Sequence, residues 1–322
     1  MKHGLIIADR DIPFLAGVLE NWFDVRYLPG REIGPEDVSR AAALVVRTRT
    51  RCNSFLLEGS SVKLVATATI GTDHIDMDYC AVSGIAVASA PGCNSAAVAQ
   101  YVSTALRALA LDRPGATLGV IGAGHVGTKV AARARAVGMR VLLSDPPREA
   151  AEGPAGFTPL SDLLAQSDIV TLHIPLWPEN RDFADAAFFA ALKDGAAFFN
   201  ASRGEVVDES ALLAARPRLG RLVLDVWKNE PAVNRDLLAA ADIATPHIAG
   251  YSIQGKINGT QAVVRAVGDF FDVPQLRNFF VRDVELPQIP YDIFADDAAL
   301  RSHPENFERL RSNYSYRNDQ LQ

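Results

Sequence analysis

Short apolar runs alternate with helical stretches along almost the whole chain, and this alternation limits the possible folds more than any other feature. Such a pattern is typical of βαβ units, in which parallel strands are covered by helices. Five strand candidates fall in the first ninety residues: 4–8, 25–27, 43–47, 63–67 and 85–87. Six more follow: 117–121, 141–144, 169–173, 196–200, 222–225 and 243–244. The sequence therefore predicts an α/β fold with two doubly wound parallel sheets.

The length of the chain and two long helical runs indicate how these strands are divided. At 322 residues the chain exceeds what one core usually serves, so we expect two domains. A helix predicted at 96–110 separates the two strand groups, and a second at about 256–271 is expected to return to the first domain. The predicted organisation is a discontinuous, flavodoxin-like domain (1–93 and 256–275), a Rossmann domain (94–255) and a short C-terminal segment (276–322).

Two regions have weaker patterns. A helix is expected at Pro13–Phe23, between the first two strands. In the tail, Pro287, Pro290 and Pro304 stand among acidic and aromatic residues. Prolines interrupt regular structure, so we expect a looped segment followed by one amphipathic helix at about Glu305–Tyr316.

Composition excludes several classes of function. The formal net charge of −6 has no basic block behind it, which argues against nucleic-acid and membrane-surface partners. No apolar stretch reaches the 18 residues of a membrane-spanning helix. Cys52, Cys80 and Cys93 form no C-x-x-C pair, so neither a disulfide framework nor a metal site is expected. A reducing, cytoplasmic location fits these residues best.

A glycine-rich loop follows the first strand of the second group. Gly122-Ala123-Gly124-His125-Val126-Gly127 is a G-x-G-x-x-G motif, which is weak evidence when it stands alone. Here it comes directly after the strand at 117–121 and opens a helix predicted at 126–137. The N–H groups and the positive dipole end of such a helix suit a pyrophosphate, so the context predicts a dinucleotide site.

Individual residues of this motif have distinct expected roles. Gly122 permits the tight turn, Gly124 lets the phosphates approach the backbone, and Gly127 lets the helix lie close to the sheet. Asp145 ends the next strand, at about the right distance for a carboxylate that accepts both ribose hydroxyls. This acid favours NAD over NADP, although the nearby Arg148 leaves NADP open.

Three later segments supply catalytic candidates at the ends of predicted strands, where open α/β sheets place ligands. The segments are Asn200–Gly204, Asp225–Pro231 and Thr245–Gly250. His247 can take the hydroxyl proton of a 2-hydroxy acid while hydride leaves for a nicotinamide. Glu230 beside it would orient the imidazole and favour its charged form, and Arg203 can hold the substrate carboxylate in a two-pronged contact.

These segments, with His173-Ile174-Pro175-Leu176, resemble the D-2-hydroxyacid dehydrogenase family over nearly all of residues 1–275. The resemblance assigns catalytic roles to the arginine, glutamate and histidine just described and implies NAD as the cofactor. It also implies a set of cofactor contacts in the loops that follow the strands. Beyond the glycines and the acid, these are His125, Val126, His173, Pro175, Ala201, Asp225 and Gly250.

The first domain contains candidates for reading a phosphate. In the extended segment 43–51 the strand period of two puts Arg47, Arg49 and Arg51 on one side, a good arrangement for a dianion. For Arg49 and Arg51, pairing with nearby acids is an equal alternative, so Arg47 is the better candidate. Segments 68–76, 90–94 and 247–256 resemble members of the family that act on a small phosphorylated 2-hydroxy acid. That likeness adds Thr48, Thr69, Tyr251 and Lys256 as substrate contacts.

Two alternatives remain open at this stage. The chain could oxidise another small 2-hydroxy acid, or it could be an NAD-sensing interaction module like the transcriptional corepressors that resemble this family. The family also implies a homodimer. Its phosphorylated-substrate members have a longer C-terminal dimerisation domain, of which residues 296–301 and 307–314 resemble only the opening part.

Overall fold

The computed structural model describes residues 2–321, which form two compact units. The first unit contains the chain up to Asn94 together with Ser252–Leu286. The second contains Ser95–Tyr251 and the tail from Pro287 onward. The tail does not form a unit of its own, because its first residues cluster with the first unit and the remainder with the second.

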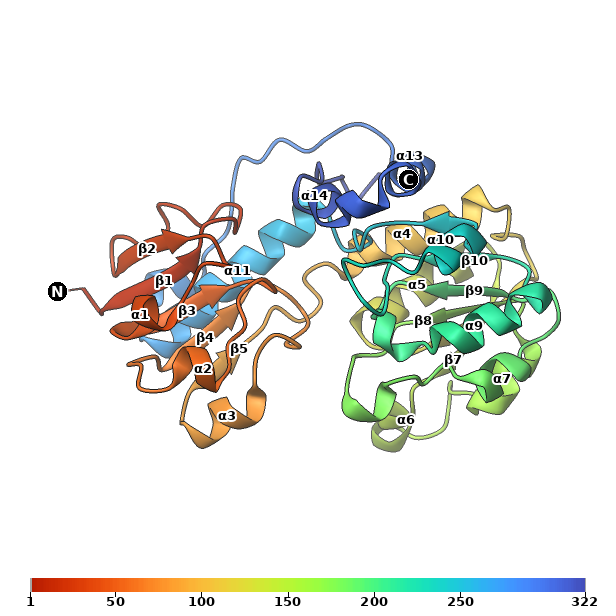
Figure 1. Ribbon diagram of the computed structural model, residues 1–322, viewed down its shortest axis with the longest axis horizontal. Coiled ribbons are helices and arrows are strands. Elements are labelled where there is room, and N and C mark those ends of the chain that lie inside the picture. Colours follow the sequence, from red (N-terminus) through yellow and green to blue (C-terminus); the bar gives the residue numbers. More distant parts are fainter. Residues whose placement is uncertain (1, 322) are drawn as a thin grey trace. The chain divides into compact units, whose positions relative to one another are not determined.

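The first unit is built on a five-stranded parallel sheet with the order β2-β1-β3-β4-β5 (Figure 1). Its strands are β1 (Leu5–Asp9), β2 (Asp24–Leu28), β3 (Ala41–Val46), β4 (Leu64–Thr67) and β5 (Ala86–Ala88). This order is that of flavodoxin-like sheets, in which strands are added on both sides of the first one.

Alternation of side chains along the strands gives this sheet two buried faces. Ile6 and Ala8 pack into one core cluster with the valines of α11, among them Val264. Ile7 points the other way into a second cluster with Leu44. The helices of the unit are α1 (Pro35–Val38), α2 (Ser54–Leu57), α3 (Met77–Val82), α11 (Ile253–Phe270) and α12 (Pro274–Arg277).

The expected helix at Pro13–Phe23 is wrong. The segment is a series of turns, with positive φ angles of 62° at Phe14 and 84° at Gly17 that no α-helix contains. Leu15, Leu19 and Phe23 are all fully buried, so the four-residue spacing reflects packing against the sheet rather than helical structure.

The second unit contains a six-stranded parallel sheet with the order β7-β6-β8-β9-β10-β11. The strands are β6 (Thr117–Ile121), β7 (Arg140–Ser144), β8 (Ile169–Leu172), β9 (Ala197–Asn200), β10 (Leu222–Leu224) and β11 (Ile243–Ala244). From β6 the chain adds β7 on one side and then β8 on the other, so the direction in which strands are added reverses between β6 and β8. Loops that follow these two strands therefore meet at the switch point, where open parallel sheets bind ligands.

Helices cover both faces of this second sheet (Figure 1). They are α4 (Ser95–Ala108), α5 (His125–Ala136), α6 (Pro146–Glu152), α7 (Leu160–Gln166), α8 (Ala186–Ala190), α9 (Glu209–Ala215) and α10 (Arg235–Ala240). Short 3-10 turns lie at Pro178–Asn180, Gly204–Val206 and Arg216–Arg218. Of the helices in residues 2–321, none has the length and apolar character needed to cross a bilayer.

The tail differs from the expectation of one helix at Glu305–Tyr316. It contains α13 (Ile293–Ser302), a 3-10 turn at Pro304–Asn306 and the short α14 (Phe307–Ser312). Asp292 begins α13 by accepting hydrogen bonds from the backbone N–H groups of Phe294 and Ala295. Asp297 of α13 accepts the N–H of Ala244 at 2.7 Å, which ties the tail to the edge strand β11.

Candidate active site

The glycine loop connects β6 to α5 at the switch point of the second sheet. A Cβ atom on Gly127 would lie 1.9 Å from the carbonyl oxygen of Gly122, so only glycine permits this approach. Gly124 begins α5 and has open space where a side chain would stand. A bare helix N-terminus with room above it fits the pyrophosphate of a dinucleotide.

Asp145 stands beside this loop, at the end of β7. Its carboxylate accepts the backbone N–H of Ala123 at 2.7 Å and that of Arg148 at 3.1 Å. Arg148 is held in turn by Glu152 at 2.7 Å. The acid is thus fixed next to the glycine loop, where a ribose attached to the pyrophosphate would lie.

Replacing Asp145 with alanine is expected to weaken NAD binding by about 10-fold and to reduce the preference over NADP. The ribose hydroxyls would lose a charged acceptor, whose hydrogen bonds are worth about 1.5–3 kcal/mol. Titration of each cofactor by protein fluorescence measures both effects. Asp145→Asn removes the charge but keeps one acceptor, because its amide oxygen can still accept the N–H of Ala123. Asp162→Ala, an exposed acid of α7, is the control, and an unchanged cofactor preference would place the ribose elsewhere.

The other expected cofactor residues lie at the same edge of the sheet. His173 follows β8, and burial lowers the pKa of its imidazole to about 3, so the ring is neutral. Pro175 and His125 are exposed, and Val126 is half-buried. Ala201 follows β9, while Gly250 lies beyond β11. These positions follow three different strands and one helix start, as expected for a site built from loops.

Asp225 has a structural task in addition to its expected contact with the cofactor. The carboxylate is buried and accepts the hydroxyl of Thr245 at 2.6 Å and the N–H of Ile248 at 2.8 Å. Its second oxygen accepts the N–H of Ala249 at 2.9 Å. Asp225 therefore holds both sides of the loop that contains His247.

Glu230 and His247 form a direct pair. The distance between Glu230 Oε2 and His247 Nδ1 is 2.8 Å, which leaves Nε2 as the ring atom available for a substrate. Glu230 Oε1 accepts the N–H of Trp227 at 3.1 Å, so the carboxylate is fixed from both sides. Burial alone would raise the pKa of Glu230, but His247 and Arg311 outweigh it and hold the pKa below its ordinary value. The pair is a carboxylate-oriented imidazole of the kind used for proton transfer.

Arg203 lies in the turn after β9. Asn200 supports this turn by donating its side-chain amide to the carbonyl oxygen of Arg203 at 2.8 Å. Arg203 donates from Nη1 to the carbonyl of Ser202 at 2.9 Å, and its side chain is half-buried. The guanidinium thus belongs to the same edge of the second sheet as the Glu230–His247 pair.

Two arginines of the tail also reach this edge, and the sequence analysis did not identify them. Arg311 of α14 donates from Nε to the hydroxyl of Tyr251 at 3.1 Å and lies 3.6 Å from Glu230 Oε2. Arg317 is buried against the loop after His247. Neither arginine stands in a recognisable motif, so no local sequence signal could have found them.

The expected substrate residues of the first unit are placed as follows. Arg47 directly follows β3 and pairs with Asp9 at 3.0 Å and with Asp11 at 3.0 Å. Its charge is therefore offset by two carboxylates, and its expected contact with a phosphate stays a prediction. Thr48 is exposed beside it. Thr69 follows β4, where its hydroxyl contacts that of Thr67 at 2.7 Å, and Lys256 lies on α11.

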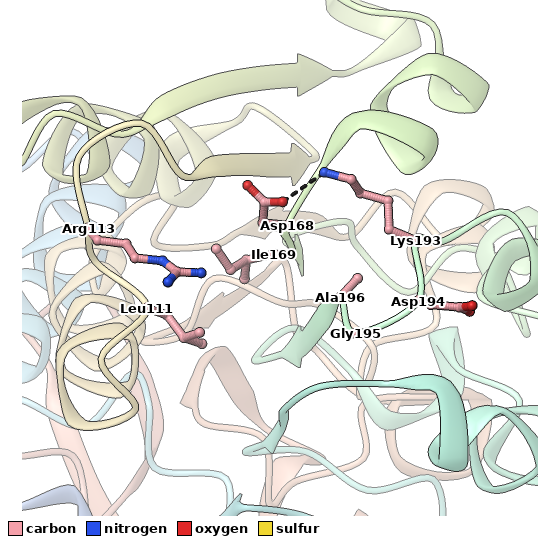
Figure 2. A pocket seen from close by; sticks show the side chains of 8 residues that line it. All are labelled: Leu111, Arg113, Asp168, Ile169, Lys193, Asp194, Gly195 and Ala196. Atoms are coloured by element: carbon pink, nitrogen blue, oxygen red, sulfur yellow. Dashed lines mark hydrogen bonds and ion pairs between the residues drawn. The ribbon is translucent and has the colours of Figure 1, made fainter.

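A small pocket of about 130 Å³ lies at the opposite edge of the second sheet. Figure 2 shows Asp168 and Ile169, at the start of β8, and Ala196 just before β9 among the residues that line it. Lys193 and Asp168 pair across it at 2.7 Å. The pocket adjoins the N-terminal ends of the strands, so it is separate from the cofactor edge. No group of three or more histidine, cysteine or acidic side chains in residues 2–321 could hold a metal ion.

Comparison with known families gives a match over most of the second unit. Residues 94–249 match the model described as "D-isomer specific 2-hydroxyacid dehydrogenase, NAD binding domain". The erythronate-4-phosphate dehydrogenase of Bacteroides fragilis is 43% identical, over 98% of this chain and 97% of that protein. The enzyme of the same name from Cronobacter sakazakii is 39% identical, over 98% of this chain and 92% of that protein.

Two solved structures are also similar to this chain. The TT0316 protein of Thermus thermophilus is 28% identical with a TM-score of 0.73, covering 83% of this chain and 96% of that one. A D-lactate dehydrogenase from Aquifex aeolicus, complexed with NAD and lactic acid, is 26% identical with a TM-score of 0.68. The match covers 87% of this chain and 100% of that one.

Proposed function

Because this chain belongs to the D-isomer specific 2-hydroxyacid dehydrogenase family, we propose that it is an NAD-dependent enzyme that oxidises 4-phospho-D-erythronate. The product is 2-oxo-3-hydroxy-4-phosphobutanoate, an intermediate on the way to pyridoxal 5′-phosphate. The observation that carries this proposal is the Glu230–His247 pair at 2.8 Å, at the same sheet edge as the glycine loop.

NAD held by the glycine loop and Asp145 would supply the acceptor for the hydride from C2 of the substrate. His247 takes the hydroxyl proton at Nε2, because Nδ1 faces Glu230 and only the second nitrogen can meet the substrate. The ionised Glu230 stabilises the imidazolium formed in this way. Arg203 binds the substrate carboxylate and favours negative charge on the C2 oxygen as the proton leaves.

We propose substrate contacts for each unit separately. Thr48, Thr69 and Lys256 are the proposed contacts on the first unit, and Tyr251 is the contact on the second. Arg49 and Arg51 supply positive charge near Thr48, while Arg47 acts chiefly by holding that turn through Asp9 and Asp11.

A panel of 2-hydroxy acids tests the function directly. With NAD present, the increase in reduced-nicotinamide absorbance should be fastest with 4-phospho-D-erythronate. Unphosphorylated D-erythronate should have a kcat/KM at least about 10-fold lower, since charge-assisted contacts worth about 1.5–3 kcal/mol are lost. Faster turnover of lactate, glycerate or 3-phosphoglycerate would reassign the substrate. No turnover of any acid, with NAD still bound, would favour an NAD-sensing interaction protein.

We also propose a cytoplasmic homodimer. Burial raises the pKa of the Cys52 thiol to about 12 and that of Cys93 to about 11, so both stay protonated and are suited to a reducing compartment. Dimerisation is proposed from the family, and sedimentation at working concentration tests it, because a monomer would have a mass of 34.7 kDa.

A further inference from the structure

The tail helix α14 places the guanidinium of Arg311 close to Glu230 of the proposed acid–base pair. Arg311 donates to the Tyr251 hydroxyl at 3.1 Å and approaches Glu230 Oε2 to 3.6 Å. Only 12% of its side chain is exposed, whereas Arg309 on the same helix is exposed to solvent. Burying a guanidinium is costly unless charged or polar partners compensate it, and here both named partners belong to the proposed site.

A second arginine anchors the tail at this place. Arg317 donates to the carbonyl oxygens of Ile248 at 2.8 Å and of Tyr251 at 3.1 Å, and also to Ala249. Its Nε donates to Gln100 Oε1 at 2.9 Å, which attaches the same side chain to α4. The backbone that leads from His247 to Tyr251 is therefore held by the tail on one side and by Asp225 on the other.

Arg311 is one of two cations that act on the Glu230 carboxylate. His247 and Arg311 both face the carboxylate, and each lowers its pKa. Glu308 and Tyr251 face Arg311 in turn, with Glu308 at 3.9 Å. Because Glu230 keeps a cation after His247 gives up its proton, the carboxylate stays ionised in both states of the imidazole.

We propose that Arg311 is a positioning residue of the active site, which holds the Glu230 carboxylate and the Tyr251 hydroxyl in place from the tail. The inference rests on the proposed function of the Glu230–His247 pair. It extends that function to a segment outside both sheets. Tyr251 receives its orientation from Arg311, so the tail contributes to substrate binding as well as to the acid–base pair.

Arg311→Met and Arg311→Lys separate charge from packing. At neutral pH the methionine variant should lose about 10-fold in kcat/KM for 4-phospho-D-erythronate. Without the cation the pKa of Glu230 should rise. The lysine variant keeps the charge and should keep the wild-type titration of Glu230. Arg309→Met, from the exposed face of the same helix, should behave like the wild-type chain.

A double-variant cycle and a titration without substrate complete the test. If Arg311 acts on Tyr251, the KM effects of Arg311→Met and Tyr251→Phe should not add. Carboxyl NMR of the substrate-free protein should show Glu230 titrating at higher pH in Arg311→Met than in the wild type. That titration decides the role of Arg311 even if 4-phospho-D-erythronate proves not to be the substrate. Equal losses in the methionine and lysine variants, with an unmoved Glu230 titration, would overturn the proposal.

Discussion

Replacing His247 with alanine or asparagine should lower kcat by about 100-fold or more, because the proton acceptor for the C2 hydroxyl is lost. Affinity for NAD should change little, since the glycine loop and Asp145 lie on other strands. Steady-state absorbance of the reduced cofactor gives kcat, and fluorescence titration gives the affinity.

Asparagine is the more informative of the two substitutions. His247 has a φ of 57°, a left-handed conformation that asparagine adopts more readily than alanine. A loss seen with both variants therefore reflects the missing imidazole rather than a distorted loop. His303→Asn is the matched control, because His303 is an exposed histidine of the tail that pairs only locally with Glu305. Near-normal turnover of His247→Asn would remove this residue from the mechanism.

Arg47→Ala should lower the free energy of unfolding by about 3 kcal/mol. Asp9 is fully buried and pairs with Arg47 at 3.0 Å, so removal of the guanidinium leaves a buried carboxylate without its main compensating charge. Urea denaturation followed by circular dichroism measures the loss. The double variant Arg47→Met with Asp9→Asn should recover part of it, because the stranded charge is then also gone.

Arg51→Ala separates stability from phosphate binding. This neighbouring arginine is exposed, so its loss should leave stability within about 0.5 kcal/mol. The KM of the Arg51→Ala variant for 4-phospho-D-erythronate should still rise, whereas its KM for unphosphorylated erythronate should change little. If Arg47→Ala instead keeps wild-type stability and alone raises KM for the phosphorylated acid, Arg47 is the phosphate reader and the ion pair with Asp9 is incidental.

Strands were the most predictable part of the fold. Each is a short apolar run between turn residues, and the predicted β6 has the bounds found in the structure, Thr117–Ile121. The other predicted strands lie within about two residues of their observed ends. Burial on both faces of a parallel sheet requires such continuous apolar runs, which is why the signal is strong.

Helical spacing of apolar residues predicted helices less reliably than apolar runs predicted strands. At residues 13–23 the buried Leu15, Leu19 and Phe23 imitate a helix, although the positive φ at Phe14 and Gly17 excludes one. α13 was missed because the prolines before it suggested a continuous loop, while its start depends on a cap from Asp292. Local propensity is weak evidence where tertiary packing decides the structure.

Proximity in the site was predictable only between neighbouring strands. Glu230 and His247 follow β10 and β11, which pair in the sheet, so their closeness could be expected from topology. Arg311 lies 81 positions beyond Glu230 along the chain, on a segment with no predicted place in either sheet. A contact of this kind depends on how the tail packs, which no local pattern in the sequence specifies.

The return of the tail to the loop after β11 has a consequence for the order of events on the ribosome. Synthesis proceeds from the N-terminus, so β6–β11 emerge before the residues that secure the end of their sheet. Asp297 and Arg317 emerge after β11, and until then the backbone from His247 to Tyr251 lacks its bonds to Arg317. A nascent chain can therefore acquire both sheets before its proton-transfer machinery is ordered.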